Sequence, residues 1–182
     1  FSLIFGQYII NKISLIQPIG QPIRNDGPEN HLIQKAGTPT MGGLLIILSV
    51  IISLVLWSDL QNAFIWIGFL TLFVFGFIGF IDDYKKIKSN SSNGLKARTR
   101  IILQIFFAFI ISIIVVNNLN DQIDTTIAFP FFKNLIINFG YFYFIISLFI
   151  IVGSANAVNL TDGLDGLAIV PVMIVAMSFA FI

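Results

Sequence analysis

Long apolar runs, separated by shorter polar stretches, limit what this chain can fold into. Several runs approach the ~20 residues that a helix needs to cross a bilayer. Of the 182 residues, 57% are apolar and only 10% are charged, a balance outside the range of soluble domains. We therefore predict an all-α, polytopic integral membrane bundle that forms a single domain over residues 1–182. The runs are Phe1–Ile16, Gly42–Trp57, Ala63–Ile81, Ile101–Val116, Leu135–Val152 and Leu167–Ile182.

The first and last runs coincide with the two ends of the sequence. We therefore expect both of these helices to be cut short and the chain to be a fragment. The chain contains no cysteine, which excludes disulfides and metal sites built from thiolates.

Lysine and arginine orient the runs in the membrane. The chain has ten such residues, and if alternate loops share a side, all of them except Lys133 fall together. Because cytoplasmic loops hold the excess of Lys and Arg, the loops Gln17–Met41 and Asp82–Arg100 are predicted to be cytoplasmic, and by parity so is Ser154–Gly166. The outward loop Asn117–Asn134 contains the aromatic sequence FPFF and is expected to form a short interfacial hairpin.

Two adjacent carboxylates, Asp82 and Asp83, end the third apolar run and are followed by Lys85 and Lys86. On a helix, Lys86 lies within side-chain reach of both carboxylates, because it stands four and three residues after them. One interpretation is a solvated helix end with snorkelling lysines. The other is a site for Mg²⁺, which prefers hard oxygen ligands and is usually shared with substrate phosphates.

The segment Asn156–Ala168, NAVNLTDGLDGLA, places a polar side chain at every third position. On a continuous helix these side chains would spread over about half a turn. A helix interrupted by glycines would instead curl side chains and backbone N–H groups around a ligand. A plain turn explains the glycines, but it does not explain four such groups beside membrane runs. The four are Asn156, Asn159, Asp162 and Asp165.

Two further polar segments suit a phosphate group. Lys35–Gly43, KAGTPTMGG, combines a cation, hydroxyls that include Thr40, and glycines that allow the backbone to approach a ligand closely. Gly94–Arg100, GLKARTR, alternates basic residues that could attract anionic lipid or a diphosphate. Each also has a simpler explanation, as a Pro/Gly-rich helix entry and as a charge cluster that only sets topology.

In order and spacing, four segments resemble the bacterial phospho-N-acetylmuramoyl-pentapeptide transferase family (MraY), within the superfamily of polyprenyl-phosphate N-acetylhexosamine-1-phosphate transferases. The resemblance covers essentially the whole chain. The wider superfamily shares the Asp-Asp and DGxDG elements, whereas the stretch that ends in GTPTMGG is more particular to the muramoyl-pentapeptide branch. The four segments are Pro22–Gly43, Gly79–Lys86, Gly94–Arg100 and Asn156–Ala168.

The resemblance implies a membrane enzyme of ten helices, about six of which are represented here. The implied reaction transfers phospho-MurNAc-pentapeptide from UDP-MurNAc-pentapeptide to undecaprenyl phosphate with Mg²⁺. It gives lipid I and UMP, as the first membrane step of peptidoglycan biosynthesis. We expect a multi-pass protein of the bacterial inner membrane with its active site on the cytoplasmic face. The two substrates and the lipid bilayer are the expected partners; no nucleic acid is expected, and the oligomeric state, a homodimer included, stays open.

The resemblance also assigns site residues by their match to the family's motifs. Asp82 and Asp83 match the catalytic pair, one of which is proposed to deprotonate the lipid phosphate, and both are candidate Mg²⁺ ligands. The family's principal Mg²⁺-binding aspartate would lie beyond Ile182, so we expect this fragment to be inactive alone. Arg100 stands where the family usually has lysine. The compact ammonium of lysine is thereby replaced by the planar guanidinium of arginine. The catalytic candidates are Asp82, Asp83, Lys86 and Asp165, and the substrate-binding candidates are Lys35, Thr40, Arg100, Asn156, Asn159, Asp162 and Gly163.

Three alternatives remain. The nearest is a sister transferase that uses UDP-GlcNAc or another UDP-sugar. A transporter would need polar groups at mid-bilayer, whereas these runs are apolar at their centres. A non-catalytic membrane scaffold leaves the repeated Asp-Gly pair unexplained.

Overall fold

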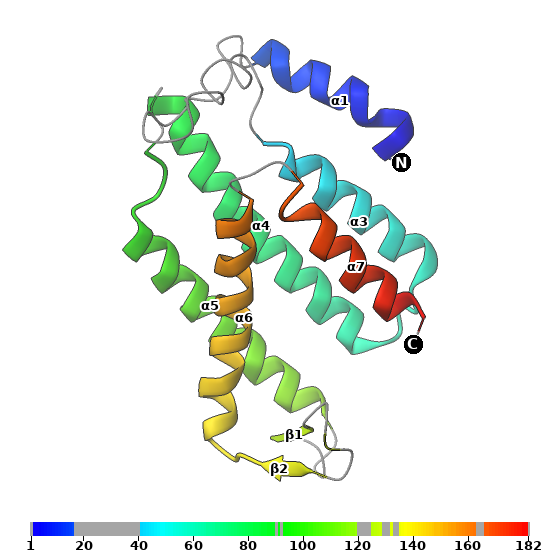
Figure 1. The fold of residues 1–182 in the computed structure, drawn as a ribbon, viewed down its shortest axis with the longest axis vertical. Helices are drawn as coiled ribbons and strands as arrows, with labels where there is room; N and C mark the ends of the chain where they lie inside the picture. The colour runs from blue at the N-terminus through cyan, green and yellow to red at the C-terminus, as the bar shows by residue number, and fades with distance from the viewer. Residues whose placement is uncertain are drawn as a thin grey trace. The chain divides into compact units, whose positions relative to one another are not determined.

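The computed structural model describes residues 2–16, 41–89, 91, 93–119, 125–128, 132, 135–162 and 166–181. Within these residues the structure is almost entirely helical, with one small antiparallel hairpin (Figure 1). The helices are α1 (Ser2–Ile16), α3 (Gly43–Trp57), α4 (Ala63–Ser89), α5 (Ala97–Asn118), α6 (Phe142–Thr161) and α7 (Ile169–Ala180), and the strands are β1 (Thr126–Ala128) and β2 (Ile136–Asn138).

Helices α4, α5 and α6 are long and apolar enough to cross a membrane. A hydrocarbon core of ~30 Å needs about 20 helical residues, and these helices have 27, 22 and 20. Helices α3 and α7 are apolar but shorter, with 15 and 12 residues. The chain is an all-α, multi-pass membrane protein, which confirms the prediction from the apolar runs.

Apolar side chains cover the outside of these helices. Among the described residues, the buried apolar core consists of Ile67, Ile78, Ala108 and Ile111. Helices α3, α6 and α7 bury no residue in the described part of the chain. Such a surface would favour association in water, whereas in a bilayer it faces lipid tails of similar polarity.

The chain folds into two compact units, residues 1–107 and 108–182. In the first unit, α1 packs on α3, and α3 packs on α4. A Cβ atom placed on Gly76 of α4 would lie 2.5 Å from Cδ1 of Ile47 on α3. Because two carbon atoms cannot approach this closely without overlap, only glycine fits here without a shift of its neighbour, and it allows the two helices to approach closely.

In the second unit, two serine hydroxyls link α5 to α6. The Oγ atoms of Ser112 and Ser147 lie 2.7 Å apart, and either can donate. Each hydroxyl also reaches a carbonyl of its own helix. Beside them, the rings of Phe109 and Phe144 meet edge to face with centroids 5.8 Å apart. Polar and aromatic contacts therefore hold this pair of helices together within the apolar region.

A hairpin forms here, but only its first strand lies in the predicted loop Asn117–Asn134, because β2 lies in the run Leu135–Val152. Its interfacial position stays a prediction. Strands β1 and β2 pair antiparallel, with Ile127 opposite Ile137. The Oδ1 atom of Asn138 accepts hydrogen bonds from the Thr125 hydroxyl, at 2.6 Å, and from the Gly140 N–H, at 2.8 Å. One carboxamide thus ties the end of the second strand to the residue before the first. Residues 129–131 of the aromatic sequence lie outside the described residues.

The run Leu135–Val152 was predicted as one membrane segment, and its first part is not helical. It begins with strand β2, and α6 starts only at Phe142. The physical reason lies in Gly140, which has a φ of +50°. This left-handed conformation is easily adopted by glycine and cannot continue a strand or a right-handed helix.

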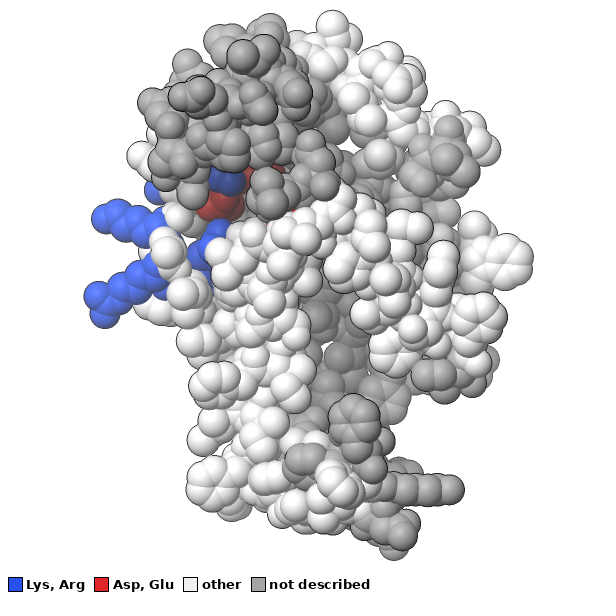
Figure 2. All heavy atoms as spheres, viewed as in Figure 1, with Lys and Arg blue, Asp and Glu red and all other residues white. Residues whose placement is uncertain are grey.

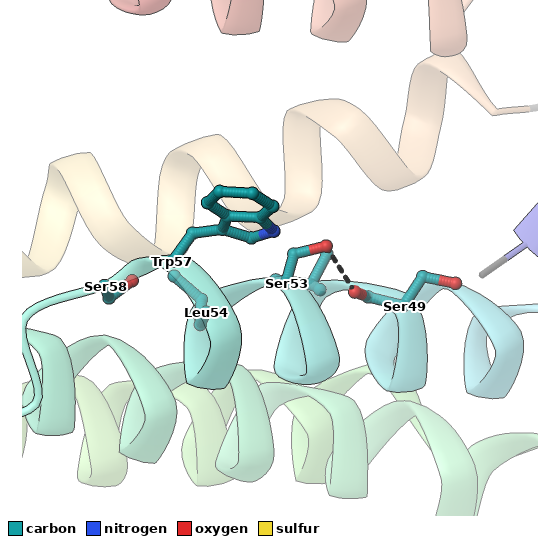
Figure 3. A pocket seen from close by; sticks show the side chains of 6 residues that line it. Ser49, Ser53, Leu54, Trp57 and Ser58 are labelled. Atoms are coloured by element: carbon teal, nitrogen blue, oxygen red, sulfur yellow. Dashed lines mark hydrogen bonds between the residues drawn. The ribbon is translucent and has the colours of Figure 1, made fainter.

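Helix α3 has an open groove of about 420 Å³ along one face (Figure 3). The Ser53 hydroxyl donates to the carbonyl of Ser49 at 2.9 Å, so this hydroxyl is used within the helix. No lining residue is ionisable. Its lining residues are Ser49, Val50, Ser53, Leu54, Trp57 and Ser58.

Candidate active site

Helix α4 continues beyond its apolar run. The sequence predicts that the run ends at Ile81, but the helix reaches Ser89. The pair Asp82–Asp83 therefore lies inside the helix and not at its end. Lys86 and Lys88 occupy the last helical turn, where cations interact favourably with the helix dipole.

Lys86 binds both carboxylates of the pair. Its Nζ atom lies 2.5 Å from Oδ2 of Asp82 and 3.0 Å from Oδ1 of Asp83. These are the i,i+4 and i,i+3 contacts that the sequence spacing predicts. One ammonium group thus offsets part of the repulsion between two neighbouring carboxylates, and the three side chains together keep a net negative charge.

Asp82 is buried, with 8% of its surface exposed. Its Oδ1 atom accepts a hydrogen bond from the backbone N–H of Leu95 at 2.6 Å. Asp82 is therefore not part of a merely solvated helix end, because a carboxylate at the surface stays hydrated, whereas this one is buried and has two protein partners. The side chains of Asp83 and Lys86 are more open, at 28% and 30% exposure.

Arg100 adds positive charge beside this pair. It lies in the first turn of α5, and its charge acts on the carboxylate of Asp82. Its Nε atom is buried and has no hydrogen-bond partner among the described residues. Since buried polar groups are normally paired, this N–H is suited to donate to an anionic group.

Figure 2 shows the charged side chains of this region gathered together, with lysine and arginine around the acidic atoms. They come from the end of α4 and the start of α5, which follow each other in the first unit. Among the predicted residues, this is where the structure brings Asp82, Asp83, Lys86 and Arg100 together.

The second polar segment begins inside α6. Asn156 and Asn159 lie on this helix, which continues to Thr161, so the prediction of a loop from Ser154 is wrong. The Asn156 side chain donates to the carbonyl of Val152 at 2.8 Å. Small polar side chains in a helix interior can bond to the carbonyl one turn earlier, and here the helix continues past its first asparagine to Thr161.

The helix ends near the glycines, which agrees with the interpretation of a helix interrupted by glycines. Asp162 is the C-terminal cap of α6, and its N–H donates to the carbonyl of Val158 at 3.1 Å. Gly166 has a φ of +82°, a conformation that favours glycine, and α7 starts at Ile169. Asp162 is exposed, so its side chain is open to a ligand.

Four predicted site residues lie outside the described residues, and their roles stay predictions. They are Lys35, Thr40, Gly163 and Asp165.

The acidic pair has the donor chemistry that Mg²⁺ prefers. This ion is usually bound by one or two carboxylates together with substrate phosphates, and Asp82 and Asp83 offer two adjacent carboxylates. In the part of the chain that the structure describes, no three His, Cys, Asp or Glu side chains form a metal-binding group. A Mg²⁺ ion held here would therefore need phosphate oxygens or further ligands to complete its coordination.

A family model described as glycosyl transferase family 4 matches residues 65–182, which is more than half of the chain. The chain belongs to this family. A signature described as phospho-N-acetylmuramoyl-pentapeptide-transferase signature 1 matches residues 35–47. Within the superfamily of polyprenyl-phosphate sugar-1-phosphate transferases, this family 4 member is therefore of the phospho-N-acetylmuramoyl-pentapeptide transferase type. The resemblance drawn from the motifs is confirmed, and the chain is a phosphosugar transferase.

Gly94 and Leu95 complete the acidic cluster of this family 4 transferase, and although both belong to the segment GLKARTR, the sequence alone does not indicate that they meet Asp82. Leu95 contributes only its backbone N–H, which no side-chain motif reveals. Gly94 leaves room for the carboxylate of Asp82. The available signal is the pair Asn93-Gly94, which is typical of a tight turn.

Proposed function

We propose that this protein transfers phospho-MurNAc-pentapeptide from UDP-MurNAc-pentapeptide to undecaprenyl phosphate, giving lipid I and UMP. The observation that supports this donor over other UDP-sugars is the match of the muramoyl-pentapeptide signature at residues 35–47. The cluster around Asp82 supports phosphoryl chemistry, since it joins carboxylates, an ammonium and a guanidinium. Phosphoryl transfer depends mainly on positioning and on stabilising charge, and such groups supply both.

In the proposed reaction, an oxygen of the lipid phosphate attacks the sugar-linked phosphorus of the diphosphate. The bond from that phosphorus to the bridging oxygen breaks, and UMP leaves with the oxygen. Asp83, the more open carboxylate of the pair, takes the proton of the lipid phosphate. Lys86 holds both carboxylates in place, and the buried Nε of Arg100 donates to a diphosphate oxygen.

Asp82 and Asp83 are the described residues that would hold Mg²⁺, shared with the diphosphate. When bound, the ion would neutralise charge on the diphosphate and on the departing UMP. Lys86 has a positioning role in this arrangement, because its ammonium orients the two carboxylates before any ion or substrate binds.

The proposed location is the bacterial inner membrane, with the acidic cluster on the cytoplasmic face. The clustering of Lys and Arg in the loops beside this site supports that orientation. A site at the membrane edge allows a water-soluble nucleotide to meet a phosphate on a lipid.

The test uses full-length protein in membranes, radiolabelled UDP-MurNAc-pentapeptide and undecaprenyl phosphate. We expect a labelled lipid product and UMP, lost on chelation and restored by Mg²⁺. Asp82→Asn and Asp83→Asn should each lower the rate by about 100-fold or more, the usual effect of losing one preorganised charged group. Asp59→Asn is the matched control, because this exposed aspartate accepts a hydrogen bond from the Gln61 N–H within its own turn.

Two results would contradict the proposal. Transfer from UDP-GlcNAc with no transfer from UDP-MurNAc-pentapeptide would identify a sister transferase. Undiminished transfer in both aspartate variants would overturn the assigned roles of the pair.

A further inference from the structure

We propose that the turn at Gly94 and Leu95 positions the carboxylate of Asp82 for the transfer reaction. Gly94 acts by leaving space and Leu95 by donating its backbone N–H. The inference rests on the proposed function only in that Asp82 takes part in the transfer; it adds two positioning residues, which open the segment Gly94–Arg100 but were not among the predicted site residues.

The two oxygens of Asp82 have different partners. Oδ1 accepts the Leu95 N–H at 2.6 Å, and Oδ2 contacts the Lys86 ammonium at 2.5 Å. The first partner lies in the segment between α4 and α5, and the second lies one turn further along α4. Since each oxygen of the carboxylate has a partner and Asp82 is 8% exposed, rotation of the Asp82 side chain is restricted before substrate binds.

The absence of a side chain at Gly94 makes room for these two contacts of Asp82. A Cβ atom at Gly94 would lie 2.6 Å from Cγ and 2.8 Å from Oδ2 of Asp82, and closer still to Oδ1. Distances this short require something to move. The backbone of Gly94 has no positive φ, so alanine fits its conformation, and among the described residues the obstacle is the carboxylate. Any larger residue would therefore push Asp82 or the turn out of place.

A displaced Asp82 would disturb the rest of the cluster. Lys86 bridges Asp82 and Asp83, so a shift of one carboxylate changes the position of the ammonium and of its second partner. The same turn leads into α5, whose first turn contains Arg100. The Leu95 N–H thus links Asp82 of α4 to the segment that leads into α5.

A double-mutant cycle tests this coupling with the full-length enzyme in membranes. Gly94→Ala should lower kcat by about 10-fold to 100-fold, because a misplacement of ~1 Å costs up to that much, with little change in KM for the UDP-sugar. In an Asp82→Asn background the same change should have an effect within about twofold, since coupled sites are not additive. Gly68→Ala is the matched control: it is on α4, and its Cβ would meet no described atom within 4 Å.

Equal losses from Gly94→Ala in both backgrounds would overturn the proposal, because they would mean that Gly94 acts on the fold and not through Asp82. A change in KM alone would do the same. If no transfer occurs from UDP-MurNAc-pentapeptide but another UDP-sugar is used, the proposed function fails, and the cycle is then measured with that donor.

A second measurement needs no activity and no variant of Gly94. Hydrogen–deuterium exchange of the peptide that contains Leu95 should speed up in Asp82→Ala, which removes the acceptor of its N–H. It should stay unchanged in Asp83→Ala, whose carboxylate contacts Lys86 instead. Equal exchange in Asp82→Ala and the unmodified protein would overturn the proposal even if Gly94→Ala does not fold.

Discussion

Lys86 contacts both members of the acidic pair, and each contact serves a different purpose. Its bond to Asp82 reaches a carboxylate that is largely buried, where an unpaired charge is costly. Its bond to Asp83 reaches a more open carboxylate that we assign to proton transfer. Neighbouring Lys85 is exposed, although it stands beside Lys86 in the sequence. The difference follows from helical geometry, since adjacent residues point about 100° apart.

Replacing Lys86 should therefore be far more damaging than replacing Lys85. We expect Lys86→Met to lower kcat by about 100-fold to 1,000-fold, as for the loss of one preorganised charge in an active site. Lys85→Met should stay near the unmodified rate. Initial rates of lipid product formation in membranes measure both, and equal rates in the two variants would show that the bridge to the carboxylates has no part in the reaction.

Two helices extend further than the apolar pattern predicts, and the added turns of both carry polar side chains that bond within the helix. In α4, Lys86 bonds to residues three and four positions earlier, which stabilises the extra turns. In α6, Asn156 bonds to the preceding turn and the helix continues to Thr161. Hydropathy reports where a helix leaves the bilayer, which is not the residue at which either helix ends.

At the contact between α3 and α4, the absence of a side chain at Gly76 leaves room for the side chain of Ile47. Gly76→Leu should destabilise the protein by about 1–3 kcal/mol, the usual cost of overpacking a close contact, because its Cβ would meet Ile47 at 2.5 Å. Thermal unfolding in detergent measures the effect. Gly68→Leu is the control on the same helix, and Ile47→Ala should restore part of the stability lost in Gly76→Leu.

If Gly76→Leu and Gly68→Leu lowered the unfolding temperature equally, lipid-facing effects and not the contact with Ile47 would explain the loss.

Across the whole molecule, charge is concentrated on one side of the predicted membrane topology. All lysines and arginines except Lys133 fall in loops or helix ends assigned to the same side. The acidic cluster and the basic start of α5 belong to that side as well. The few charges and the large exposed apolar side chains of the described helices fit a protein whose solvent is mostly lipid.

Because these 182 residues include no cysteine, single cysteines can report the orientation. We expect Lys96→Cys to react with a membrane-impermeant maleimide in inverted vesicles but not in intact spheroplasts, since its loop is assigned to the cytoplasm. Gln61→Cys, in the turn between α3 and α4, should show the opposite pattern. Gel-shift labelling measures both. Reaction of Lys96→Cys from the outside would reverse the proposed orientation.

The sequence alone was enough to predict the membrane class, the approximate positions of the helices, and the contact of Lys86 with both aspartates. These depend on local pattern: the length of apolar runs, turn residues, and the three- and four-residue spacing of side chains on a helix. The motifs also led to the transferase family.

The environment of the acidic pair was decided only by tertiary structure. Asp82 meets the N–H of Leu95, which is 13 residues away along the chain. That contact depends on where α4 ends, how the intervening residues turn, and the missing side chain of Gly94. No periodicity encodes such a path, because a backbone donor looks the same at every position. The sequence identified the acidic pair, and the folded turn determined that Asp82 is buried and held from both sides.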